Sequence, residues 1–197
     1  MTIVKPTILL TVFVGALSNT SCSTVETQSD LNSVEVAQAV FLRMPESQGI
    51  NETIDATQLL VADYGERSFA FEAQLEIRPG SIKIASVNMW GGILFSIDYD
   101  GSDLRTQGNS TGQGPDAQYL LGDVLLTYWD AQWLRERLHG AELKDRRDGL
   151  SRTIFRDGVP VIEISYEAAD RWTGKTQFTH IERGYVLNIQ TVSFSRS

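Results

Sequence analysis

The one cysteine of the chain, Cys22, has the type and position that point most directly to chemistry. It follows a basic residue, Lys5, and an apolar run over residues 7–17, with small polar residues directly before it. A short basic region, an apolar region of this length and small residues before the cleavage point are typical of a secretory signal peptide. A cysteine at the end of such a signal predicts attachment of a lipid to its thiol, so we expect a lipid anchor at Cys22.

Ordinary cleavage after Ser18 is the alternative, and it would leave Cys22 as a spare thiol. Asn19 stands where a lipoprotein signal usually has leucine, which keeps this alternative open. The apolar run is shorter than the roughly 20 residues of a transmembrane helix, and a single cysteine gives no internal disulfide. The expected organisation is a lipoprotein signal peptide over residues 1–21, a polar tether over 22–33 and one domain over 34–197.

The two histidines, His139 and His180, are the next candidates for chemistry. His139 precedes Gly140 at the expected end of a helix, where a cation suits the helix dipole. His180 shares a strand face with Phe178 and has no assignable nucleophile or orienting acid, so we interpret it as a buried or rim side chain. Motifs of hydrolases, zinc proteases, P-loop proteins and dinucleotide-binding domains are absent from the sequence. We therefore expect no catalytic residue, no cofactor and no enzyme activity.

Three aspartates close together suggest a calcium loop at first sight: Asp98, Asp100 and Asp103. Their spacing lacks the glycine position and the terminal glutamate of an EF-hand loop. A charged hairpin turn is the better interpretation, and we expect no metal site. The net charge of −8 would repel phosphate groups, which argues against nucleic acid as a partner.

The elements that would position any site are mainly strands. Residues 69–77 alternate apolar and polar side chains, which predicts a strand with one buried face. Further strands are expected over 81–89, 93–99, 143–146, 151–156, 159–166, 176–181 and 185–194, with Asp-Gly turns typical of antiparallel hairpins. Apolar residues at helical spacing predict helices over 115–129 and 130–140, the second capped by Asp130. A short helix is also expected over 34–43, capped by Ser33 and ended by Pro45.

One curved sheet with an apolar face and two helices with an apolar stripe predict a mainly β domain of the α+β class, because the helices can cover that face. The aromatic load near the two faces indicates a cavity between them, whereas a fully packed core is the alternative and is the more frequent outcome for any one of these residues. The expected cavity residues are Phe69, Phe71, Leu75, Phe95, Ile97, Tyr99, Leu121, Val124, Leu125 and Tyr128.

Residues 69–192 resemble a family of small bacterial lipoproteins of unknown function whose genes accompany aryl-polyene and related fatty-acid-type synthesis clusters. The matching segments are AFEAQLEI, GGILFSIDYDG, LLGDVLLTYW with WLRERL, IFRDGVPVIEISYE and GYVLNIQTV. That family is similar to LolA and LolB, the periplasmic lipoprotein carrier and its outer-membrane receptor. The resemblance implies an open antiparallel half-barrel whose concave face is covered by helices, with acyl chains held between the two.

The loop around Met89 and Trp90 resembles the loop of LolB that meets the membrane with an exposed apolar residue. Gly91 and Gly92 would let the indole project, and tryptophan suits a membrane interface. The alternative is a tryptophan folded back over the barrel mouth.

The resemblance implies a lipid-anchored protein of the outer membrane that faces the periplasm. Its expected ligand is an acyl or polyene lipid, and a LolA-like periplasmic carrier is an expected partner. Two rival functions remain, an assembly or scaffold protein with a filled core and a hydrolase or transferase that acts on the carried lipid.

Overall fold

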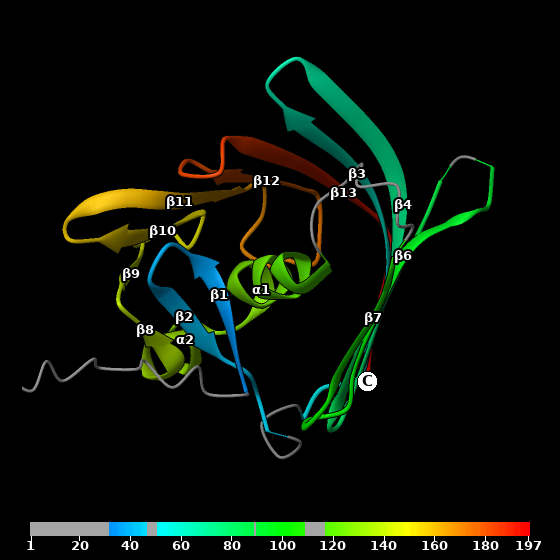
Figure 1. The fold of residues 1–197 in the computed structure, drawn as a ribbon, viewed down its shortest axis with the longest axis horizontal. Helices are drawn as coiled ribbons and strands as arrows, with labels where there is room; N and C mark the ends of the chain where they lie inside the picture. Colours follow the sequence, from blue (N-terminus) through cyan, green and yellow to red (C-terminus); the bar gives the residue numbers. More distant parts are fainter. Residues whose placement is uncertain (1–31, 47–50, 89, 109–116) are drawn as a thin grey trace, which may run out of the picture.

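The structure is a computed structural model that describes residues 32–46, 51–88, 90–108 and 117–197. These residues form two antiparallel sheets and two helices (Figure 1). The larger sheet has ten strands, which in chain order are β3 (Ile54–Tyr64), β4 (Arg67–Arg78), β5 (Ser81–Val87), β6 (Ile93–Tyr99), β7 (Leu104–Gly108), β9 (Glu142–Asp145), β10 (Ser151–Arg156), β11 (Val159–Tyr166), β12 (Lys175–His180) and β13 (Tyr185–Arg196).

The spatial order of this sheet is β7-β6-β5-β4-β3-β13-β12-β11-β10-β9. Each neighbouring pair runs antiparallel, and all but β3 and β13 are joined by the short connections of a meander. The edge strands β7 and β9 do not pair with each other, so the sheet stays open. Figure 1 shows it curving around one helix, with the remaining elements on the same concave side.

The alternation predicted for residues 69–77 is present in β4. Phe71, Ala73, Leu75 and Ile77 are buried, and the polar side chains between them are at least partly exposed. Side chains alternate between the two faces of a strand, so this pattern gives the concave face its apolar surface.

Of the three aspartates near residue 100, Asp100 and Asp103 lie in the hairpin turn between β6 and β7, and Asp98 lies in β6. One carboxylate oxygen of Asp100 accepts hydrogen bonds from the backbone N–H groups of Ser102 (3.2 Å) and Asp103 (2.8 Å). Arg105 forms an exposed ion pair with Asp100 at 3.2 Å. The described residues contain no cluster of His, Cys, Asp or Glu side chains that could hold a metal ion.

The helix expected over residues 34–43 is wrong, because this segment is a hairpin of β1 (Ser33–Ala37) and β2 (Val40–Arg43). Val34, Val36, Val40 and Leu42 are buried and alternate with more exposed residues, and β-branched side chains favour strands. The turn places Ala39 at a φ of 57°. With β8 (Leu138–His139), the hairpin forms the smaller sheet in the order β1-β2-β8.

Two helices lie inside the curve of the larger sheet, α1 (Ala117–Tyr128) and α2 (Ala131–Arg137). Pro115, expected at the first helical position, lies outside the described residues. Asp130 caps α2 as predicted, because its carboxylate accepts from the backbone N–H groups of Gln132 and Trp133. The helix ends at Arg137 rather than near residue 140, since Leu138 is extended and pairs with Leu42 of β2.

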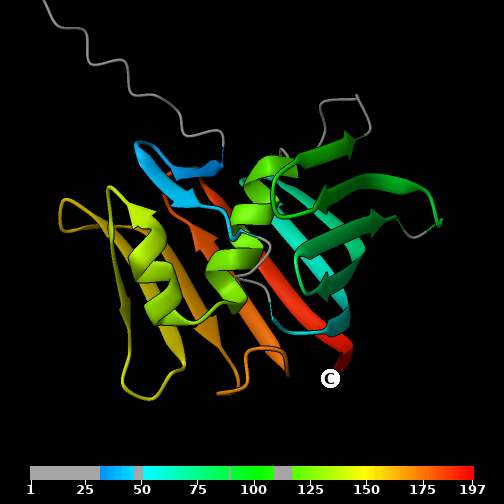
Figure 2. The same cartoon turned by 90° about the horizontal axis from the view of Figure 1, so that it is seen from below.

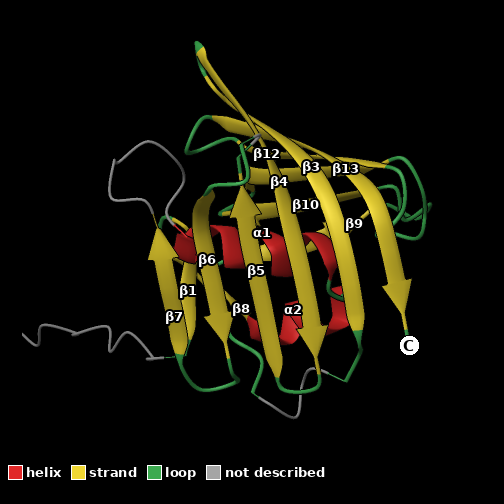
Figure 3. Cartoon of the chain, turned by 90° about the vertical axis from the view of Figure 1, so that its right-hand side faces the viewer, coloured by secondary structure: helices red, strands yellow, loops and turns green. Residues whose placement is uncertain are grey.

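The layers are therefore the larger sheet, α1 against its concave face, and the smaller sheet on another side of α1. Figure 3 looks onto the outer face of the larger sheet and shows α1 crossing behind β4, β5 and β6. Figures 1 and 2 both place β1 and β2 beside α1. The predicted fold class, a mainly β open antiparallel half-barrel with helices on its concave face, is confirmed.

His180 joins the end of β12 to the smaller sheet. Its ring is fully buried, its Nε2 lies 2.8 Å from the carbonyl oxygen of Val36, and its Nδ1 accepts from the backbone N–H of Arg183. Burial lowers the pKa of this histidine, which favours the neutral ring that these two contacts need. The predicted structural interpretation of His180 agrees with this arrangement.

The buried apolar core extends from Val34 to Ile189 along the sequence. Residues 23–197 therefore contain all of the core, and every helix and strand, that the structure describes. Neither described helix is long and apolar enough to cross a membrane.

Candidate functional site

One face of α1 looks onto the concave sheet across a narrow crevice. Residues three and four apart lie on the same face of a helix, and this face carries both apolar and polar side chains. The helix residues that line the crevice are Leu120, Asp123, Val124, Thr127 and Tyr128.

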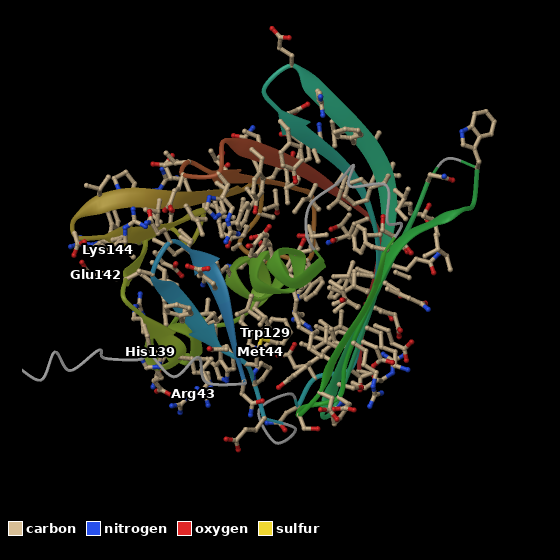
Figure 4. The ribbon with its side chains drawn as sticks, in the orientation of Figure 1. Arg43, Met44, Trp129, His139, Glu142 and Lys144 are labelled. Atoms are coloured by element: carbon tan, nitrogen blue, oxygen red, sulfur yellow. The ribbon has the colours of Figure 1, made fainter. Side chains whose placement is uncertain are left out.

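The opposite wall of the crevice is apolar, apart from Gln58. Its side chains come from β3, β4, β5, β6 and β13, strands that are brought together by the meander and by the pairing of β3 with β13. They are Leu60, Phe71, Ala73, Leu75, Ile84, Phe95, Leu187 and Ile189. Figure 4 shows side chains filling most of the space between α1 and the sheet. The remaining cavity has a volume of about 30 Å³, enough for one or two water molecules.

A larger pocket, which we call the aromatic pocket, lies where α1 meets α2. Its volume is about 210 Å³, somewhat below the roughly 300–1,000 Å³ of common ligand sites. Its aromatic lining consists of Tyr128, Trp129, Trp133 and Trp172, and Ile54, Ile77, Asn51, Glu52 and Asp130 complete it. The indole N–H of Trp133 is buried and has no hydrogen-bond partner within the described residues.

Tyr128 lines both the crevice and the aromatic pocket. Its ring stacks on Trp172 with centroids 3.9 Å apart, and its hydroxyl accepts a hydrogen bond of 2.6 Å from the side-chain amide of Gln58. Burial raises the pKa of Tyr128, so the hydroxyl stays protonated.

Two arginines, one of them fully buried, hold the C-terminal end of α1 by hydrogen bonds to its backbone. Arg152, which is fully buried, donates from Nη1 to the carbonyl oxygens of Leu126 (2.6 Å) and Trp129 (2.9 Å). The same guanidinium binds both carboxylate oxygens of Asp145, and Arg171 binds Asp145 and the Trp129 carbonyl. Burial alone would raise the pKa of Asp145, but the hydrogen bonds and charges of the two arginines outweigh it and lower that pKa.

Asp123 is a buried carboxyl group in the middle of α1. Its Oδ2 accepts a hydrogen bond of 2.6 Å from the hydroxyl of Tyr185, whereas its Oδ1 has no partner among the described residues. Burial raises the pKa of Asp123 to about 7, against smaller opposing effects of Tyr185 and Arg183. Both protonation states are therefore accessible near neutral pH.

Half of the residues predicted for the cavity line the crevice: Phe71, Leu75, Phe95, Val124 and Tyr128. Ile97, Tyr99, Leu121 and Leu125 are buried but do not line it, and Phe69 is half-buried beside Tyr64.

The smaller sheet explains why part of the apolar stripe of α1 lies away from the crevice. A Cβ atom on Gly122 would lie 2.8 Å from Cγ1 of Val36, so α1 packs closely against β1. A helix that is covered on two sides needs apolar residues beyond the face that meets the larger sheet.

Sequence reasoning missed Asp123, Gln58, Arg152 and the aromatic pocket. The signal for Asp123 was present, because this acidic residue stands inside an apolar stripe, between Leu120 and Leu121 on one side and Val124 on the other. The aromatic pocket had no such signal, since Trp172 reaches Tyr128 from a distant part of the chain.

Trp90 lies on the loop between β5 and β6. Its side chain is 91% exposed, and the neighbouring Ile93 is 66% exposed. The side chain of Asn88 shapes the loop by accepting hydrogen bonds from the backbone N–H groups of Trp90 and Gly92, and Gly91 has the positive φ of 77° that the turn requires. Met89 lies outside the described residues, as does Cys22, so the membrane loop and the lipid anchor remain predictions.

Comparisons with known proteins place the chain in a family without supplying a function. A search of curated proteins found no match. Among solved structures, the chain is similar to a LolA superfamily protein from Nitrosomonas europaea (7% identity, 73% of this chain and 85% of that chain, TM-score 0.43). It is also similar to a candidate outer membrane lipoprotein-sorting protein domain from Vibrio parahaemolyticus (9% identity, 76% and 87%, TM-score 0.36). Residues 55–193 match the model of a family described as protein of unknown function (DUF3261). The chain belongs to the DUF3261 family.

Proposed function

We propose that this protein binds one long apolar chain, an acyl or polyene lipid, between α1 and the concave face of the larger sheet. The observation that carries this function is the crevice, which is mostly apolar on both walls and shares Tyr128 with the aromatic pocket. Removing apolar surface from water stabilises such a complex by about 25 cal/mol per Å², less the free energy needed to order the chain.

Binding of such a chain requires the crevice to widen. The two sides of α1 differ in the kind of contact that they make with the sheet. The hydrogen bonds that α1 and Trp129 make with the described strands end on β3, β10, β11 and β13. The side chains that β4, β5 and β6 present to the crevice are apolar, and Phe71 and Phe95 contact each other on this wall. Because apolar contacts have no fixed direction, the wall of β4–β6 can separate from α1 while the helix keeps its hydrogen bonds.

The proposed location is the periplasmic face of the outer membrane. In this proposal residues 1–21 are the signal peptide, Cys22 carries the lipid and residues 22–33 are the tether. Trp90 and Ile93 form the apolar tip that meets the bilayer, and a LolA-like carrier is a candidate donor of the lipid. Mass spectrometry of the mature protein tests the anchor, because acylated Cys22 at its N-terminus is expected and an unmodified N-terminus at Asn19 would contradict it.

A second function is favoured by the small volume of the crevice. About 30 Å³ is far less than an acyl chain occupies, and a filled core suits a scaffold lipoprotein that binds other proteins rather than lipid. The two functions differ in one measurable respect, namely whether the folded domain takes up an apolar chain.

The test uses residues 23–197 and a dansyl-labelled undecanoic acid as the probe. The probe is expected to bind with a blue-shifted emission and to be displaced by palmitate. Phe95→Glu places a charge against the crevice and is expected to weaken binding at least about tenfold, whereas Glu72→Ala on the other face of the sheet is the matched control. Val124→Trp, which fills the crevice without a charge, gives a second variant in case Phe95→Glu does not fold. Absence of probe binding by the folded wild-type domain would remove the carrier function and favour the scaffold.

A further inference from the structure

The polar atoms on the walls of the crevice are paired within the protein, with one exception. The amide of Gln58 donates to Tyr128 and Thr191, and the hydroxyl of Thr127 donates to the backbone carbonyl of Asp123. Only Oδ1 of Asp123 lacks a partner among the described residues that line the crevice. The side chain of Asp123 is 97% removed from solvent, since the residue is 3% exposed.

An unpaired carboxyl oxygen in this position is unfavourable for the folded protein. Leaving a buried polar atom without a hydrogen bond costs about 1–3 kcal/mol, and native proteins pair almost all such atoms. The hydroxyl of Tyr64 and Nη1 of Arg183 are also buried without a partner among the described residues, and both groups interact electrostatically with Asp123. Polar partners that a hydroxyl group or a water molecule needs therefore lie near Oδ1. An apolar residue at this position would avoid the unfavourable term, so the carboxyl group is better explained by a partner that the ligand brings.

The surroundings of Asp123 restrict the chemistry of that partner. The ligand group must donate a hydrogen bond to Oδ1 when Asp123 is ionised and accept one from it when Asp123 is protonated, because both forms occur near neutral pH. A hydroxyl group meets both demands, whereas an ether oxygen can only accept and a carboxylate would be repelled by the ionised form.

An ammonium group on the ligand is a weaker fit than a hydroxyl. The guanidinium of Arg183 lies close enough to lower the pKa of Asp123, and it is held over the ring of Tyr119 at 3.6 Å from the ring centroid. A positive charge is therefore already supplied beside the carboxyl group, and a second cation would be repelled by it. The other titratable groups that face Asp123 are the hydroxyls of Tyr185 and Tyr64, which burial keeps neutral.

We infer that Asp123 selects an apolar ligand that bears a hydroxyl group, and that this hydroxyl binds Oδ1 of Asp123 inside the crevice. The inference rests on the binding of an apolar chain proposed above and adds the chemical group that distinguishes the preferred ligand. Tyr185 is a positioning residue in this site, since its hydroxyl holds Oδ2 and Oδ1 keeps no partner among the described residues.

The test compares 1-dodecanol, its methyl ether and dodecylamine as competitors of the dansyl probe on residues 23–197. The wild-type domain is expected to bind the alcohol about tenfold or more tightly than the ether, the range of one buried hydrogen bond. Asp123→Leu is expected to bring the two affinities within about twofold, and Asp123→Asn to keep part of the preference. Asp98→Leu, at a partly exposed aspartate of β6 outside the crevice, is the matched control and should keep the wild-type ratio.

Three outcomes would overturn the assignment. Equal affinities of alcohol and ether for the wild-type domain, or an unchanged ratio in Asp123→Leu, would show that Asp123 does not select a hydroxyl, while probe binding itself would leave the carrier function standing. Tighter binding of dodecylamine than of dodecanol would assign the carboxyl group to a cation instead. Failure of the probe and of both neutral competitors to bind a folded domain would remove the apolar-chain function and this assignment together.

Discussion

Asp123 is a residue that lowers the stability of the folded protein and that we propose selects the ligand. Its carboxyl group is buried on α1 with a single hydrogen bond from Tyr185, and burial raises its pKa to about 7. Above this pH the folded protein must hold a buried charge, which is unfavourable. Such a group lowers the free energy of unfolding, and proteins keep unfavourable groups of this kind mainly where they serve a function.

The pH dependence of stability should report on Asp123. An acid whose pKa is about 7 when folded and about 3.9 when unfolded binds more protons in the folded state between these values, so the free energy of unfolding falls as pH rises through this window. Compared with Asp123→Asn, the wild-type domain is expected to lose up to about 4 kcal/mol between pH 4 and 8. Urea unfolding of both proteins across this range gives the difference, in which contributions from His180 and other shared groups cancel. A difference that stays constant with pH would contradict the raised pKa.

At this scale the sequence predicted apolar wall residues better than polar ones. Phe71, Leu75 and Phe95 followed from simple alternation along strands, because side-chain direction in a strand depends only on position parity. The buried partners of Asp123 and Tyr128 lie on β13 and β3, more than 60 residues away in the sequence. Pairing across such distances depends on the tertiary fold, which alternation does not report.

Among the elements, α1 is the one whose position defines the site. Arg152 binds the backbone carbonyls at the end of this helix and pairs with Asp145, all inside the protein. An apolar side chain at this position would remove the side-chain donor of the Leu126 carbonyl and would leave Asp145 and the Trp129 carbonyl with Arg171 alone.

Loss of this guanidinium should therefore destabilise the domain strongly. Arg152→Met is expected to lower the free energy of unfolding by about 3 kcal/mol or more, and chemical denaturation measures it. Arg146→Met is the matched control, since Arg146 pairs with Asp148 on an exposed turn, and its effect should stay within about 0.5 kcal/mol. Equal effects of the two substitutions would contradict the role of Arg152 in fixing α1.

The β5–β6 loop is the element proposed to meet the membrane. Trp90→Glu is expected to abolish association of residues 23–197 with phosphatidylethanolamine–phosphatidylglycerol vesicles, because it removes the exposed indole. Thermal stability should change little, since surface substitutions usually stay within about 0.5 kcal/mol. Val159→Glu, at an exposed apolar site on the separate β10–β11 hairpin, is the control that should keep binding. Vesicle flotation measures both, and equal retention of binding in the two variants would contradict the role of Trp90.

Most elements could be predicted from the sequence, and the exceptions have a physical cause. The strands and both helices inside the sheet followed from periodicity and from turn residues such as Asp-Gly. Residues 34–43 were expected to be a helix because Ser33 and Pro45 look like its ends. Their strand conformation depends on pairing with β8 and packing against α1, which are tertiary contacts that override a short local pattern.

The whole molecule is an open sheet that curves around a helix it does not fully enclose (Figure 1). The described hydrogen bonds that hold α1 end on β3, β10, β11 and β13, whereas the side chains that β4, β5 and β6 present to the crevice are apolar. This difference supports the proposal that α1 keeps its hydrogen-bonded position while the wall of β4–β6 moves away from it when a ligand enters. The half-barrel class followed from the apolar face and the helical stripes, whereas the extent of filling depends on packing details that residue types alone do not determine.

Photolabelling with a fatty acid that carries a diazirine near the end of its chain tests the central claim most directly. The labelled domain, residues 23–197, would be digested and the modified residues located by mass spectrometry. Binding between α1 and the sheet predicts modification of crevice residues such as Phe71, Phe95 and Val124, with one label per molecule and protection by excess palmitate. Labelling confined to exposed apolar residues such as Trp90 and Ile93, or no protection by palmitate, would contradict a binding site inside the half-barrel.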